Sequence, residues 1–220
     1  MDRFGAATRR SLWALLLGLG MLSSATGCGR ALATLVYVIK GNEINAEFDG
    51  LKDKRVVVVC RPPASLEYRY GGADRQLAKR VGELLAANVK KIDLVKPSEV
   101  ENWTDQRDGD DVKELAEAVN AQIVVRIDLE DFELEKGPTL YQGKADTVIT
   151  VFDMDDEGRE IWQKSLGEFF FPVNSAVPAQ EKPLEQFRRQ FTTVLSEQIA
   201  RHFYPHDARI DFASDGLAHR

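Results

Sequence analysis

Apolar and polar positions repeat with different periods along the chain, and each period predicts an element. Residues 55–60 form a continuous run of β-branched side chains, which predicts a short strand buried on both faces. Residues 73–89 place apolar side chains at helical spacing and charged ones around the rest of the wheel, as an amphipathic helix does. Residues 91–95 predict a second strand that ends before Pro97.

The middle of the chain continues this alternation. Residues 98–110 are polar and acidic and predict a loop or a short helix. Asp111 and Glu114 have the spacing of a capping box, so we expect a helix that begins there and closes at Asn120. A third strand follows at once over residues 122–134.

The last third predicts a hairpin and a helix. Residues 144–152 and 159–171 have strong strand propensity and enclose a turn at 153–158. A proline-rich loop over 172–183 precedes an amphipathic helix over 184–203. The order β-α-β-α-β-β-β-α predicts one α/β (α+β) domain built in two or three layers.

The N-terminus has the layout of an export signal. Three arginines precede an apolar run at 12–22, and small residues lead into Cys28. The run is about half as long as a ~30 Å hydrocarbon core requires. Small residues before a cysteine resemble a bacterial lipobox, in which that cysteine carries lipid, although Ala25 stands where leucine is usual. The alternatives are cleavage without lipidation, a retained anchor, or export by the twin-arginine route that Arg9 and Arg10 resemble.

These signals divide the chain into four parts. Residues 1–27 are expected to be a lipoprotein signal peptide, and 28–53 a tether with a short apolar segment at 31–39. That segment is expected to lie near the membrane or against the domain. The globular domain is expected over 54–204, with a loose C-terminal tail at 205–220.

Composition narrows the function. Charged residues make up 29% of the chain and hydrophobic ones 44%, as in ordinary globular proteins. The net charge is −6, and residues 1–27 hold three arginines and one aspartate, which leaves the remainder at −8. This negative charge argues against a nucleic-acid partner, because contacts to phosphate groups need clustered lysine and arginine side chains. If Cys28 is lipidated, Cys60 has no cysteine with which to pair, and its thiol is interpreted as a small apolar group.

Few residues carry recognisable site chemistry, and the sequence predicts no cofactor and no catalytic residue. His202 and His206 have a spacing that could hold zinc, but Pro205 interrupts the helix between them and no further ligand is evident. Residues 153–158 match part of a calcium loop, but Lys164 stands where the bidentate glutamate belongs. We interpret them as an acidic hairpin turn.

Three passages resemble a known family: the strand 55–60, the helix-to-strand passage 114–125 and the hairpin 153–162. They are similar to the periplasmic lipoproteins and domains that include the TolB N-terminal domain, CsgG and LpoB-type activators. The resemblance implies a non-catalytic envelope domain that contacts other proteins, and it supplies no catalytic residues.

The sequence therefore predicts a lipid-anchored envelope protein that acts as a protein-binding or assembly module. Gly29 is not the aspartate that retains many Gram-negative lipoproteins at the inner membrane, so the periplasmic side of the outer membrane is favoured. Phe169, Phe170 and Phe171 are a possible partner surface. The alternatives are a metal-assisted envelope hydrolase using the two histidines, an accessory of a transport or secretion assembly, and a freely secreted binding protein.

Overall fold

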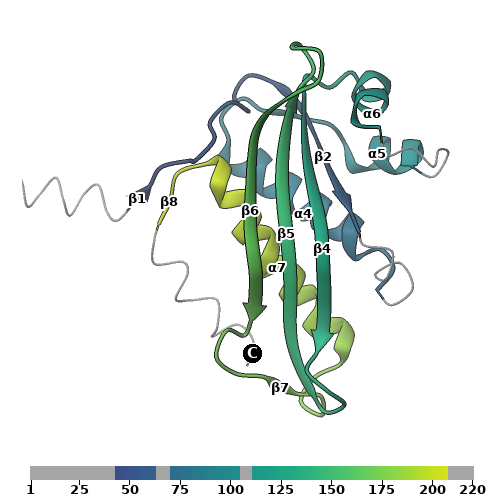
Figure 1. The fold of residues 1–220 in the computed structure, drawn as a ribbon, viewed down its shortest axis with the longest axis vertical. Helices are drawn as coiled ribbons and strands as arrows, with labels where there is room; N and C mark the ends of the chain where they lie inside the picture. Colours follow the sequence, from purple (N-terminus) through teal and green to yellow (C-terminus); the bar gives the residue numbers. More distant parts are fainter. Residues whose placement is uncertain (1–42, 63–69, 105–110, 208–220) are drawn as a thin grey trace, which may run out of the picture. The chain divides into compact units, whose positions relative to one another are not determined.

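The computed structural model describes residues 43–62, 70–104 and 111–207 (Figure 1). The chain divides into two compact units, of which the second begins at Ile44. The boundary expected at residue 54 is thus wrong, because Leu51 is 0% exposed and belongs to the core. The signal peptide, Cys28, the apolar segment 31–39 and most of the tail lie outside the described residues.

The second unit is a single α+β domain, and its order of elements confirms the predicted fold class. The short strands β1, β7 and β8 are added to the expected order, and α5 is the short helix that was one alternative for residues 98–110. The elements are β1 (Glu43–Ile44), β2 (Arg55–Arg61), α4 (Ala73–Asn88), β3 (Asp93–Leu94), α5 (Pro97–Thr104), α6 (Val112–Val119), β4 (Ile123–Glu135), β5 (Leu140–Asp153), β6 (Arg159–Phe171), β7 (Val177–Pro178), α7 (Leu184–Ala200), the 3₁₀ turn η2 (Arg201–Phe203) and β8 (His206–Asp207).

The main sheet has the strand order β3-β2-β4-β5-β6, with β7 paired to β5. Strand β2 runs parallel to β3 and β4, whereas β4, β5 and β6 form an antiparallel meander. The first three strands are parallel because helical crossovers join them, and the last three are antiparallel because tight hairpins do. Strands β4–β6 are longer than β2 and β3 and extend well past them (Figure 1).

Helices cover the two faces of this sheet unequally. Helices α4 and α7 lie together along one face, where they enclose the larger core (Figure 1). Helix α6 packs on the other face only at the end where β2 and β4 begin, and it forms a smaller core with Val57 and Val124. The pattern of β4 follows this cover: Ile123–Val125 is buried throughout, and from Arg126 every side chain on the second face is polar.

Local signals in the sequence set the helix ends. Asp111 Oδ1 accepts a hydrogen bond from the Lys113 N–H at 2.8 Å, so Asp111 is the N-cap of α6 as predicted. Asn120 adopts the left-handed conformation, with φ 53°, and closes the same helix as predicted. Of the alternatives for 98–110, the described part is helical up to Thr104.

Candidate functional site

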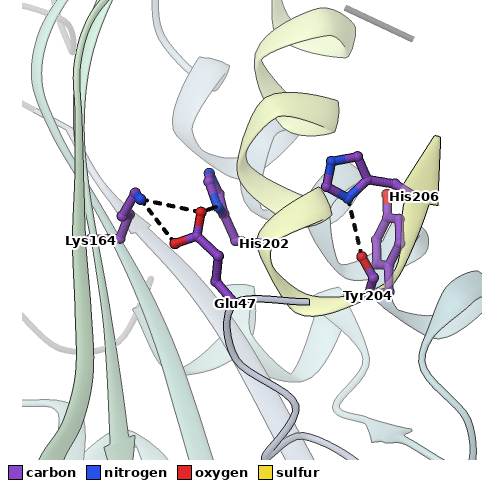
Figure 2. Close-up of polar contacts among 5 residues, drawn as sticks. All are labelled: Glu47, Lys164, His202, Tyr204 and His206. Carbon is purple, nitrogen blue, oxygen red and sulfur yellow. Dashed lines mark hydrogen bonds and ion pairs between the residues drawn. The ribbon is translucent and has the colours of Figure 1, made fainter. Parts of the chain in front are cut away.

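A strap, residues 44–53, is fastened to the domain through Glu47 (Figure 2). The backbone N–H groups of Glu47 and Phe48 donate to the His202 carbonyl at 2.8 and 3.0 Å. The Glu47 carboxylate accepts from Lys164 Nζ at 2.9 Å and lies 3.0 Å from His202 Nδ1. Lys164 comes from β6 and His202 from η2, so one carboxylate joins three segments that are distant in sequence.

Aromatic rings shield part of this cluster from water. The Phe48 ring centroid lies 5.8 Å from that of Trp162 and 6.2 Å from that of Phe203. The His202 ring lies 6.3 Å from Trp162. As a result the His202 side chain is only 13% exposed, whereas Glu47 remains 43% exposed.

The surroundings lower the pKa values of both His202 and Glu47. Burial lowers the pKa of His202 below its ordinary 6.5, although the Glu47 carboxylate opposes that shift. The hydrogen bond from Lys164 is the main cause that lowers the pKa of Glu47. At pH 7 His202 is therefore neutral, and its Nδ1–H donates to the ionised Glu47 carboxylate.

Acidification is expected to weaken the domain through this cluster. Because both pKa values are lowered by folding, the unfolded chain binds protons first as the pH falls. The contribution of His202 is complete above about pH 6.5 and is lost as the pH drops through its folded pKa; that of Glu47 is lost at lower pH, below about 4.5. Urea unfolding between pH 7.5 and 5 should show a shallower decline for His202→Gln than for wild type. Parallel curves for the two proteins would refute this role of His202.

His202 and His206 have separate polar partners in the structure. Figure 2 shows Glu47 turned toward His202, whose Nδ1 it occupies, and away from His206. His206 Nδ1 lies 3.3 Å from the Tyr204 carbonyl oxygen. Within the described ranges, no group of three or more His, Cys, Asp or Glu side chains converges as metal ligands would.

The remaining thiol behaves as a small apolar group. Cys60 is partly buried in β2 and packs against the larger core. Burial raises the pKa of its thiol well above the ordinary value, and the charges of Asp74 and Asp128 raise it further. A thiol that stays protonated at pH 7 is a poor nucleophile, which agrees with the interpretation from sequence.

The acidic residues after β5 form a hairpin turn. Asp153 Oδ1 accepts from the Asp155 N–H at 2.9 Å, which tightens the turn. Asp155 Oδ2 in turn accepts from Lys54 Nζ at 2.8 Å and from Gln122 Nε2 at 3.1 Å. Gly158 has φ 70°, a conformation that glycine adopts without strain. These contacts use the carboxylates within the protein and favour the hairpin interpretation over a calcium loop.

The three consecutive phenylalanines point to different places. Phe171 is 1% exposed and stacks on Phe187 in the core, so its assignment to a partner surface is wrong. Phe169 packs against the same core and stacks on Phe191. Phe170 alternates to the opposite face of the sheet, where it is half-buried. Of the three, Phe170 alone stays available on the uncovered face.

We call the part of the sheet beyond helix α6 the open sheet face, because no helix of the described ranges covers it. Its side chains come from β4, β5 and β6, and ion pairs tie them into a layer. Arg126 Nε bonds Asp128 at 2.8 Å, while the Arg126 guanidinium lies 4.8 Å from the centre of the Phe152 ring. Further along, Lys144 Nζ bridges Asp131 at 3.0 Å and Glu168 at 2.8 Å. The face is therefore polar and ordered.

The sequence did not reveal this surface, although it contained one signal. Polar and apolar side chains alternate over 126–130 and again over 131–135, which indicates a strand face without helical cover. The sequence could not show that Asp131, Asp146 and Glu168 lie opposite one another, because this depends on the register of three strands.

The fold and its surfaces define a class: a single α+β domain with helices along one face of a mixed sheet and a polar open face on the other. Among the helices of the described ranges, none combines the length and the apolar content needed to cross a membrane. No family model matches the chain, and no curated protein matches it.

Solved structures of bacterial proteins do match the chain. A PelC dodecamer from Paraburkholderia phytofirmans is 16% identical, with a TM-score of 0.41 over 72% of this chain and 96% of that one. Lipoprotein GNA1162 from Neisseria meningitidis is 12% identical, with a TM-score of 0.40 over 67% and 98%. A minor lipoprotein from Acinetobacter baumannii is 14% identical, with a TM-score of 0.31 over 67% and 90%.

Two of these neighbours are named as lipoproteins. The narrower grouping with TolB, CsgG and LpoB stays a prediction. At these TM-scores and identities, the likeness defines neither a family nor a function for this chain.

Proposed function

We propose that this chain is a lipid-anchored protein of the cell envelope that acts as a non-catalytic binding or assembly module. The observation that carries the proposal is the open sheet face. A sheet normally covers both faces with helices or keeps one face solvated, and here the uncovered face is held in a fixed arrangement by bridging ion pairs. The half-buried ring of Phe170 and the polar groups around it offer aromatic and polar contacts to another protein.

The anchor in this proposal is Cys28. The basic, apolar and small-residue order of residues 1–27 supports export, and the lipobox-like end supports lipid on the cysteine. The acidic body would gain little from anionic lipid headgroups, so a covalent chain is the appropriate means of attachment. We propose that the domain faces the periplasm, with the outer membrane favoured by Gly29.

The metal-assisted hydrolase is a weaker proposal for physical reasons. Zinc needs three or four converging ligands, and within the described ranges no such group of His, Cys, Asp or Glu side chains gathers around His202 and His206. Glu47, which lies beside His202, is held by Lys164, which favours its role as a structural tie. These contacts support a binding protein over an enzyme built on this pair of histidines.

Replacing Cys28 with alanine is expected to release the protein from the membrane. Wild type should begin at Cys28, carry added lipid mass and sediment with membranes, whereas Cys28→Ala should lose both the lipid mass and the sedimentation. Intact mass and membrane fractionation measure the two effects directly.

Cys60→Ala is the matched control, because it removes the other cysteine of the chain and should leave lipidation unchanged. If wild type and Cys28→Ala are both soluble and unmodified, the proposed anchor is wrong and the freely secreted alternative takes its place.

A further inference from the structure

The strap is held to the domain by contacts of a kind that a peptide from another protein can make. We define the strap seat as the four residues that hold Glu47 and the residue after it: Trp162, Lys164, His202 and Phe203. The His202 carbonyl accepts two backbone N–H groups, and every peptide residue except proline offers one. Lys164 Nζ bonds both oxygens of the Glu47 carboxylate, at 2.9 and 3.2 Å (Figure 2). This polar side of the seat therefore fits a peptide backbone with one carboxylate.

An aromatic ring occupies the apolar side of the strap seat. The Phe48 ring centroid lies 5.8 Å from that of Trp162, and it meets the Phe203 ring edge to face at 6.2 Å. The Phe48 ring also lies over Gly50 of its own segment, where a Cβ would be 2.6 Å from the ring. Phe48 is nonetheless only partly buried. A carboxylate followed directly by an aromatic ring is thus the pattern that the strap seat fits.

The two halves of the strap are fastened to different degrees. In the first half, residues 44–48, Ile44 is 44% exposed, and the ion pair of Glu47 with Lys164 lies at the surface, where such pairs contribute little. In the second half, Leu51 is 0% exposed and belongs to the larger core. Segments with few buried apolar contacts open locally while the rest of a domain stays folded. The first half of the strap is therefore able to leave the seat while Leu51 stays in place.

The charge of the strap seat selects the chemistry of its occupant. Within the described ranges, Glu47 is the only carboxylate that pairs with Lys164. Departure of the first half of the strap would leave this lysine unpaired beside the rings of Trp162 and Phe203. In a chain with a net charge of −6, the seat is thus a cationic and aromatic position in an acidic protein. Complementary charge favours an acidic segment as its occupant over a basic one.

We infer that the strap seat is a docking position for a segment of a partner protein in which an acidic residue precedes an aromatic one, and that Glu47 and Phe48 occupy it until this segment displaces them. The strap competes from the same chain, at high effective concentration, so a partner binds with reduced affinity while the strap is in place. Trp162 packs on the larger core, and Lys164 shares its face of β6. The inference therefore goes beyond the proposed function, whose open sheet face is the opposite one.

A labelled peptide with the sequence of residues 43–50 tests the strap seat, because it contains the acidic and aromatic pair. Fluorescence anisotropy measures its binding to the full chain in detergent. Phe48→Ala removes the competing ring, and Gly50→Ala displaces that ring with its new Cβ, so both variants free the seat without changing it. Each should bind the peptide at least about tenfold more tightly than wild type. Adding Lys164→Met to Phe48→Ala should weaken binding about tenfold, because a charged hydrogen bond is lost.

Lys136→Met in the Phe48→Ala chain is the matched control, because it removes an exposed lysine outside the strap seat and should leave binding unchanged. A peptide that itself carries Phe48→Ala should bind none of these chains. Circular dichroism confirms that each variant folds. The inference is overturned if neither freed variant binds the peptide, or if Lys164→Met leaves binding unchanged. Wild-type dimers that the peptide dissociates would overturn it as well, because the strap of a second copy would then be the occupant. The tests of the lipid anchor are independent of these results.

Discussion

Phe191→Ala is expected to destabilise the domain by about 3–5 kcal/mol, the usual cost of removing a fully buried phenyl ring. Phe191 is 0% exposed and lies at the centre of a ring cluster, 5.2 Å from Phe132 and 6.3 Å from Phe169 between centroids. Gly143 on β5 provides the space for this ring, since a Cβ there would lie 2.5 Å from it. Alanine would leave a cavity that the sheet and α7 cannot close. Urea unfolding monitored by far-UV circular dichroism measures the loss.

Phe170→Ala is the matched control for Phe191→Ala. Phe170 lies on the open sheet face and is half-buried, so the same truncation should cost about 1 kcal/mol. A loss for Phe170→Ala as large as that for Phe191→Ala would mean that the open sheet face is part of the stabilising core. That result would also contradict its role as a binding surface.

Removal of the strap is expected to have the second large effect. A chain shortened to 54–220 should be at least about 3 kcal/mol less stable than one shortened to 43–220. The shorter chain loses Leu51, which is 0% exposed, and the packing of Phe48 on Trp162. It also loses the two backbone hydrogen bonds to the His202 carbonyl.

Leu51→Ala in the 43–220 chain separates the apolar part of this effect from the polar part. It should account for most of the loss, because exposed ion pairs such as that of Glu47 with Lys164 contribute about 0–1 kcal/mol. Glu47→Gln should accordingly have a small effect at pH 7. Equal stability of the 54–220 and 43–220 chains would restore the domain boundary expected from the sequence.

The strap shows why a sequence pattern can misplace a boundary. Residues 41–54 are polar and contain two glycines, which is typical of a linker. Their few apolar side chains, among them Phe48 and Leu51, have no period of their own. Phe48 packs on Trp162 and Phe203, and Leu51 belongs to the larger core. Whether the strap is buried therefore depends on the residues that it packs against, and these lie far from it in the sequence.

The metal candidates show a similar limit. His202 and His206 have a favourable spacing in sequence, but their partners decide their chemistry. Glu47, distant in the chain, occupies His202, and the Tyr204 carbonyl lies beside His206. A spacing along one segment gives no information about a carboxylate that arrives from another.

The sequence by itself determined the order and type of the main elements, since hydrophobic period and caps act over neighbouring residues: the buried strand β2, the capped helix α6 and the meander β4–β6 follow from them. The sequence also predicted the location in the cell envelope through lipidation of Cys28, and this stays a prediction. Tertiary structure alone decided which face of the sheet stays bare, which of Phe169–Phe171 enters the core, and that Asp131, Asp146 and Glu168 share one row. Those features depend on strand register and β-bulges, and a shift of one residue would send each side chain to the opposite face.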